Sequence, residues 1–384
     1  MATRLAFLIT EDWYFRQHFL ALAIAARDAG YDIHVLCRTG ERGSGAAGSI
    51  RMAGLGLHEI PFARSGVNGI KDLSTRRRII ETYRTLNPDI VHNIALKPII
   101  YGQAAARSVG IPARVNFLPG FGHVFTSDTL KTRLLRPLIS FALSRALAGE
   151  SIGLMVMNQN DRAEIAALAG AAASRVTVLP GTGVDLNQFE KAPEPDSPLV
   201  VTYVGRFLRD KGLRELIEAG RLLDRRGATV KIRLVGAPDP SNPTSIGASE
   251  QAAWEKETFI EILPWTDDVA SVWRRSHLAV LPSYREGFGM SLVEAAASGR
   301  ALIATDVQGC REAVLDRRSG ILVPPRDPVS LAGAIETLAF DPALRQRFAA
   351  SARRDAEERL SSDCINQQVL DLYDGVLRSG RADR

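Results

Sequence analysis

The chain has 384 residues, of which 46% are apolar and 24% charged, and its formal net charge is +5. This length is too great for one ordinary core and suits two domains, and the composition is that of a soluble globular protein rather than a disordered or fibrous one. No apolar run reaches the roughly 20 residues that a membrane-spanning helix needs. The three cysteines lie far apart without metal-ligand spacing, which argues against a disulfide framework and a zinc site.

The first half of the chain alternates short β-branched runs with longer helical ones. Its first apolar run is too short for a signal peptide, so we expect a cytoplasmic protein. Strands alternating with helices predict crossover connections and a parallel sheet. The predicted strands cover residues 4–9, 32–37, 57–61, 89–93, 114–117 and 153–156, and the predicted helices cover 15–29, 74–86, 99–109 and 130–148.

A polar, proline-rich stretch at 190–198 has no periodicity and is predicted to link two domains. A second α/β series and a helical tail follow it. The prediction is therefore an α/β protein with two doubly wound domains, whose ligands bind in a cleft at the carboxyl ends of the strands. In the second series the predicted strands are 199–204, 230–235, 259–263, 278–281, 301–304 and 320–323, the helices are 212–226, 249–254, 267–275 and 290–298, and the tail is 328–378.

A basic loop follows the strand predicted at 199–204. Gly205 allows the backbone to approach a ligand closely, and Arg206 and Lys211 place two cations between the end of a strand and the start of a helix. A planar guanidinium beside a point charge suits a diphosphate. A basic loop alone is more often a solvated turn, and only its place beside a second motif favours the ligand.

The second motif is a pair of glutamates, Glu286 and Glu294, on either side of a glycine turn. The first lies at the turn and the second about two turns into a small, apolar helix. That helix should be buried, and a buried carboxylate is costly unless it is hydrogen-bonded or paired. Ribose hydroxyls would satisfy Glu294, and amides at the helix start can bind a diphosphate. The alternative is a surface turn that leads into an ordinary core helix.

These motifs, in this order, closely resemble those of retaining glycosyltransferases of family 4, which have the GT-B fold. Within that family the chain looks most like bacterial enzymes that build polysaccharides or lipid-linked oligosaccharides. The resemblance implies an acceptor-binding Rossmann-like domain at 1–188, onto which the helix at 365–384 packs back, and a nucleotide-sugar-binding domain at 189–364. It covers essentially the whole chain, through the stretches 11–18, 89–92, 97–102, 119–125, 158–161, 180–185, 205–212, 282–299 and 305–312.

The resemblance also implies roles for single residues. Arg206 and Lys211 would bind the diphosphate, Glu286 would contact hydroxyls of the transferred sugar, and Glu294 would hold the ribose. Arg206, Lys211 and Glu286 would be catalytic, together with His123. Relatives often have a tyrosine at the position of His123. Further donor contacts would come from Gly287, Phe288, Gly289, Met290, Ser291 and Leu292. The acceptor side would include His18, Lys97, Gly120, Gly122 and His123, with core packing as the alternative for His18.

The implied reaction moves a hexose or N-acetylhexosamine from a UDP-sugar to a glycan acceptor on a polyprenyl diphosphate, in surface polysaccharide biosynthesis. The family needs no metal or cofactor, and the sequence has no clear Asp-x-Asp metal motif. The alternatives are a soluble acceptor or a UDP-sugar epimerase, which the run 205–212 disfavours. A basic membrane- or nucleic-acid-binding module would use the arginine excess, but it leaves the glutamate pair unexplained and lacks RNA-type aromatic motifs. We therefore expect no nucleic-acid partner.

A predicted helix at 129–148 carries basic residues among apolar ones. A basic amphipathic helix in an acceptor domain can lie on an anionic membrane surface. The alternative is an ordinary helix whose apolar side packs on the sheet. We expect peripheral contact with the inner face of the plasma membrane, made by Lys131, Arg133, Arg136 and Arg145.

Overall fold

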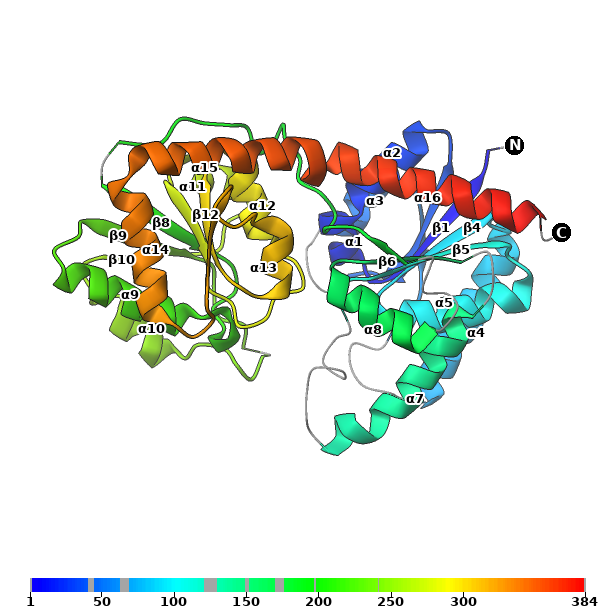
Figure 1. The fold of residues 1–384 in the computed structure, drawn as a ribbon. Coiled ribbons are helices and arrows are strands. Elements are labelled where there is room, and N and C mark those ends of the chain that lie inside the picture. The colour runs from blue at the N-terminus through cyan, green and yellow to red at the C-terminus, as the bar shows by residue number, and fades with distance from the viewer. Residues whose placement is uncertain are drawn as a thin grey trace. The chain divides into compact units, whose positions relative to one another are not determined.

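The computed structural model describes residues 2–40, 45–62, 69–120, 130–148, 152–169, 176–196, 198–240 and 242–382. The residue contacts divide the chain into two units. The first consists of Met1–Thr182 and Ile365–Arg384, and the second of Gly183–Cys364. Each unit is built on one parallel sheet with helices on both faces (Figure 1), which confirms the predicted fold class of two Rossmann-like domains.

The first unit has a seven-stranded sheet in the order β3-β2-β1-β4-β5-β6-β7. Two of its strands, β4 and β6, are buried along their whole length, as expected of a parallel sheet covered on both faces. The strands are β1 (Arg4–Glu11), β2 (Asp32–Arg38), β3 (Gly56–Glu59), β4 (Ile90–Ile94), β5 (Ala113–Leu118), β6 (Ile152–Val156) and β7 (Val176–Val178). The helices are α1 (Asp12–His18), α2 (Leu20–Asp28), α3 (Ala46–Met52), α4 (Gly69–Leu86), α5 (Leu96–Val109), α7 (Leu130–Leu147) and α8 (Gln159–Ala169).

The second unit has a six-stranded sheet in the order β10-β9-β8-β11-β12-β13. The strand order reverses between β8 and β11, and ligands of doubly wound sheets bind at such a switch point. The strands are β8 (Leu199–Val204), β9 (Val230–Val235), β10 (Ile260–Leu263), β11 (Leu278–Leu281), β12 (Ala301–Thr305) and β13 (Gly320–Val323). The helices are α9 (Leu213–Arg225), α10 (Ala248–Trp254), α11 (Val269–Arg274), α12 (Met290–Ala297), α13 (Gln308–Ala313), α14 (Pro328–Phe340) and α15 (Pro342–Asp355).

The last helix, α16 (Ser362–Ala382), brings the chain back to the first unit. Val369, Tyr373 and Val376 are buried in the same hydrophobic cluster as residues of β1, β2 and β5. The Tyr373 hydroxyl lies 2.7 Å from Nδ1 of His92, which is fully buried on β4. The chain therefore passes between the two units twice, after Thr182 and after Cys364.

Two predicted segments differ in the structure. The helix expected at 15–29 is two helices, because Phe19 leaves helical geometry (φ −126°, ψ −6°) and its buried ring packs edge-on against Phe117. The stretch expected to link the domains, 190–198, belongs to the second unit. Arg345 pairs with Glu194 at 2.8 Å, and Arg300 donates to backbone carbonyls of the same stretch. These anchors come from distant positions, which local composition does not reveal.

Candidate functional site

The loop after β8 approaches its neighbours closely because it carries glycines. Gly205 donates its N–H to Val235 O at 3.0 Å, and a Cβ on Gly236 would lie 1.9 Å from Gly205 O. The next residue, Arg206, is 57% exposed and pairs through Nη1 with Asp239 Oδ2 at 3.0 Å. An exposed guanidinium is thereby held at the carboxyl end of the central strand β8.

Lys211 ends the short 3₁₀ turn after this loop. Gly212 follows it in the left-handed region (φ 68°), and a Cβ there would lie 2.0 Å from Pro282 O. The basic loop is therefore pressed against the segment that follows β11, and Tyr284 N–H donates to Asp210 O at 2.8 Å across this contact. Only a glycine permits this approach without moving one of the two loops.

The ammonium of Lys211 lies 2.5 Å from Glu286 Oε2, so the structure brings two predicted site residues together. Their side chains are only 20% and 14% exposed, and the Ser283 hydroxyl donates to the same carboxylate oxygen at 3.0 Å. Behind the turn, a Cβ on Gly309 would lie 2.3 Å from Glu286 O. The carboxylate is thus fixed by a cation, a hydroxyl and close backbone packing.

A glycine turn leads from Glu286 into α12. In the described part of the chain, no side chain caps the N-terminus of this helix at Gly289. Phe288 is buried and Leu292 is fully buried, and the Leu292 N–H already donates to Gly289 O at 2.9 Å. Met290 and Ser291 are partly exposed at the helix start. Met290 N–H donates to Phe288 O at 3.0 Å, whereas Ser291 N–H has no backbone partner among the described residues and suits an anion at the helix start.

Glu294 lies one turn further along α12 and is half-buried in a helix that is otherwise largely apolar and buried. Burial raises the pKa of Glu294 to about 7, and the neighbouring side chain of Trp273 offsets part of that rise. The indole nitrogen of Trp273 is itself buried, and its contact with the Glu294 carboxylate falls short of hydrogen-bond geometry. A polar ligand here would satisfy groups that the protein leaves only partly satisfied.

The residues predicted for the acceptor side lie in the first unit. Lys97 is the second residue of α5, which starts shortly after β4, and its ammonium is 3.8 Å from Asp72 Oδ1. Gly120 follows β5 with φ 140°, in the region that favours glycine. The two residues thus follow the carboxyl ends of neighbouring strands. Gly122 and His123 lie outside the described residues.

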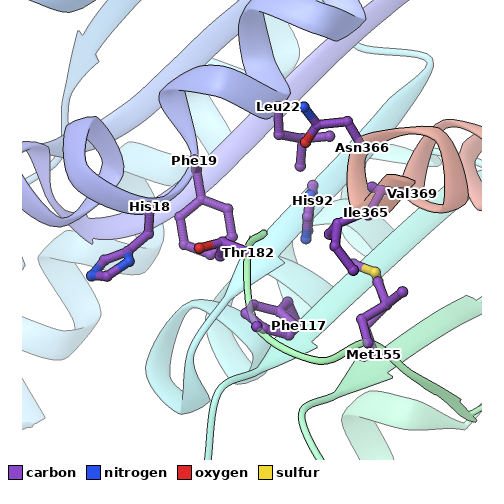
Figure 2. Close-up of a pocket in the computed structure, with 12 residues that line it drawn as sticks. His18, Phe19, Leu22, His92, Phe117, Met155, Thr182, Ile365, Asn366 and Val369 are labelled. Atoms are coloured by element: carbon purple, nitrogen blue, oxygen red, sulfur yellow. The ribbon is translucent and has the colours of Figure 1, made fainter. Parts of the chain in front are cut away.

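His18 borders a small cavity between α1, the sheet and α16 (Figure 2). The cavity is lined mostly by apolar side chains, and His92 and Asn366 are its buried polar members. In Figure 2 the ring of His18 points away from His92. Burial lowers the pKa of His18 to about 4, so this ring is neutral near pH 7.

The structure identifies site residues that the sequence interpretation missed. Ser283 and Gly309 both lie close to Glu286. They belong to stretches that carried the resemblance, and that membership was a signal from which they could have been found. Asp239 and Trp273 gave no such signal, because only the fold brings them to Arg206 and Glu294. Within the described ranges, no group of three or more His, Cys, Asp and Glu side chains is placed to hold a metal ion.

The basic helix α7 is partly described. Leu138 and Phe141 are 64% and 65% exposed, whereas Leu143 is fully buried. Arg133 and Arg145 are also exposed, and the side chain of Lys131 is outside the described ones. None of the helices in the described part of the chain is long and apolar enough to cross a membrane.

Two family models match the chain. The model described as Glycosyl transferases group 1 matches residues 184–355, and the model described as Glycosyl transferase 4-like matches residues 4–148. The two matches fall on the second and the first unit, respectively.

Known proteins of similar sequence and structure span nearly the whole chain. An N,N'-diacetylbacillosaminyl-diphospho-undecaprenol alpha-1,3-N-acetylgalactosaminyltransferase of Campylobacter jejuni is 27% identical over 345 residues, which is 86% of this chain and 88% of that protein. The capsular polysaccharide biosynthesis glycosyltransferase CapM of Staphylococcus aureus is 25% identical, over 84% of this chain and 85% of its own length. Among solved structures, Anabaena HepE in complex with UDP superposes with a TM-score of 0.78 at 18% identity, over 98% of this chain and 100% of that one.

Proposed function

The chain is a glycosyltransferase of family 4 with the GT-B fold, and from this we propose that it transfers a hexose or N-acetylhexosamine from a UDP-sugar to a glycan carried on a polyprenyl diphosphate. The proposed transfer retains the anomeric configuration and needs no metal. Its setting would be the synthesis of a bacterial surface polysaccharide. HepE, which has the same fold, holds UDP, and the Campylobacter relative is named for a diphospho-undecaprenol acceptor.

The observation that carries this proposal is the Lys211–Glu286 pair at the mouth of the glycine turn. An ammonium has three donors, of which the carboxylate uses one, so Lys211 can also contact a phosphate oxygen. Both known contacts of Glu286 fall on Oε2, and we assign Oε1 to hydroxyls of the transferred sugar. The Lys211–Glu286 pair would then bind both groups that the breaking bond joins, the phosphate through Lys211 and the sugar through Glu286.

The chemistry follows from these positions. When the glycosidic bond to phosphate breaks, negative charge grows on the departing diphosphate and positive charge on the sugar ring. Arg206, Lys211 and the amides at the start of α12 are placed in advance for the first charge, which lowers the barrier. In the proposed front-face attack, the leaving phosphate takes the proton of the acceptor hydroxyl.

The acceptor side and the membrane contact are further parts of the proposal. Lys97 and Gly120 follow neighbouring strand ends, where a ligand of the first sheet would bind. We assign His18, Gly122 and His123 to the same side. The exposed Leu138 and Phe141 on α7 suit peripheral contact with an anionic membrane on the cytoplasmic side.

The test uses the purified chain with a panel of UDP- and GDP-sugars, measuring thermal stabilisation, sugar transfer to a polyprenyl-diphosphate-linked acceptor, and the anomeric configuration of the product. We expect stabilisation by a UDP-sugar, a retained anomer and full activity in EDTA. Glu286→Ala should abolish transfer with the fold retained, and Glu255→Ala, an exposed site in the same unit, should leave it unchanged. Binding of no nucleotide sugar, or an active Glu286→Ala, would contradict the proposal.

A further inference from the structure

Trp265 is an exposed aromatic residue beside the proposed donor site. Its side chain is 52% exposed, and it lies two residues after the end of β10. A single exposed apolar residue normally needs no explanation. The position of Trp265 in the sheet is what makes it informative.

The carboxyl ends of three neighbouring strands lie side by side at this place. Leu263 of β10 pairs with Val235 of β9, which in turn pairs with Val204 of β8. Since strands are about 4.8 Å apart, two strand spacings put the residues after β10 roughly 10 Å from Gly205 and Arg206. The N–H of Gly236 donates to Leu263 O at 3.1 Å and ties the two loops together. This separation is comparable to the span of a nucleoside diphosphate.

Hydrogen bonds fix the part of the Trp265 loop that leads into α11. Asp268 caps α11 by accepting from Ser271 N–H at 3.1 Å, and its own N–H donates to the Thr266 hydroxyl at 3.1 Å. At the other end of α11, Trp273 lies against Glu294. The helix therefore connects the Trp265 loop to the carboxylate that we assign to the ribose.

We propose that the indole of Trp265 is the platform on which the nucleobase of the donor stacks, an inference that rests on the proposed function. The diphosphate at Arg206 and Lys211, the ribose at Glu294 and the base at Trp265 would then follow one another along the carboxyl edge of the sheet. Every nucleobase has a π-face, so stacking adds affinity without selecting one base. The braced loop limits the entropy that is lost on binding.

The experiment measures the dissociation constants of UDP and GDP by calorimetry for the unmodified chain and three variants. Trp265→Leu keeps an apolar side chain but removes the π-face, and Trp265→Phe restores an aromatic ring. Phe340→Ala is the matched control, because Phe340 is 68% exposed and ends α14, whose Glu336 pairs with Arg226 at the end of α9 remote from Lys211. We expect Trp265→Leu to weaken binding by about 5- to 150-fold. Trp265→Phe should stay within about fivefold of the unmodified chain, and Phe340→Ala should not change.

The possible outcomes separate the two proposals. Loss of affinity in Trp265→Leu with rescue in Trp265→Phe supports stacking. Equal binding by Trp265→Leu and the unmodified chain, or equal losses in both Trp265 variants, overturns the inference and leaves the donor proposal standing. An unmodified chain that binds neither nucleotide overturns both.

Discussion

Lys211 serves two partners in the proposed donor complex, the carboxylate of Glu286 and a phosphate of the leaving diphosphate. Lys211→Ala removes a preorganised positive charge, and we expect kcat to fall by about 10²- to 10³-fold, as for the loss of one donor to a developing negative charge. The measurement is steady-state transfer with the UDP-sugar found in the panel. Lys256→Ala, at an exposed position in the same unit, is the control. Equal kcat values for the two variants would remove Lys211 from the mechanism.

Glu294 makes the stability of the second unit depend on pH. Burial raises its pKa from 4.5 to about 7, so the folded chain favours the neutral carboxyl. Stability should therefore be highest with Glu294 protonated, and should decline as the pH rises from about 4.5 through about 7. Glu294→Gln keeps the shape but cannot ionise. We expect it to be more stable than the unmodified chain by roughly 1–3 kcal/mol at pH 8, and equal to it near pH 4.5.

Urea unfolding curves of the Glu294→Gln variant and the unmodified chain, recorded at several pH values, measure this difference directly. Other titrating groups are common to both proteins and cancel. A difference that does not change between pH 4.5 and pH 8 would mean that Glu294 ionises as freely in the folded chain as in the unfolded one.

The short helix α13 supports the donor turn through one glycine. A Cβ on Gly309 would lie within 2.7 Å of three backbone atoms of Glu286 and Gly287, so the turn itself would have to move. We expect Gly309→Ala to cost about 1–3 kcal/mol of stability through overpacking. Transfer should fall up to about 100-fold, because small misplacements of reacting groups are costly.

Gly333→Ala is the matched control for Gly309→Ala. Gly333 lies inside α14, where a Cβ would meet nothing within 4 Å. Alanine should therefore stabilise the chain by about 0.5–1 kcal/mol through its better helix propensity, with activity unchanged. Thermal unfolding and transfer rates of both variants test the pair. Similar behaviour of the two would show that α13 has no special contact with the turn.

At the level of elements, the strands of both sheets were largely predictable from the sequence, because parallel strands buried on both faces are continuous apolar runs. Short elements such as α3, α13 and β7 were missed, since a few residues carry little periodicity. The break at Phe19 and the anchoring of 190–198 depend on tertiary contacts.

The candidate site was predictable in part. Lys211 and Glu286 are 75 positions apart, and the sequence placed both in one donor site. The strand order of the fold explains why they meet, since each follows a strand at the switch point. The contacts of Asp239 with Arg206 and of Trp273 with Glu294 left no local pattern, and only the folded chain reveals them.

Because the chain passes between the units twice, the two units differ in whether each can fold alone. The second unit, 183–364, contains every strand and helix of its sheet in one continuous segment. The first unit needs α16, which contributes Val369, Tyr373 and Val376 to its core. Losing three buried side chains at about 2 kcal/mol each removes an amount comparable to the whole stability of a typical domain.

Fragments of the chain test this difference. We expect 183–364 to fold alone, and 1–182 to remain unfolded because its core lacks α16. Joining 1–182 to 365–382 through a short glycine-serine linker should restore cooperative unfolding, since Thr182 and Ile365 border the same cavity and their ends need little extra chain. Circular dichroism and thermal unfolding of the three fragments are the measurements. If 1–182 folds as stably without α16 as with it, the helix only covers this unit, and its three apolar residues contribute little to the core.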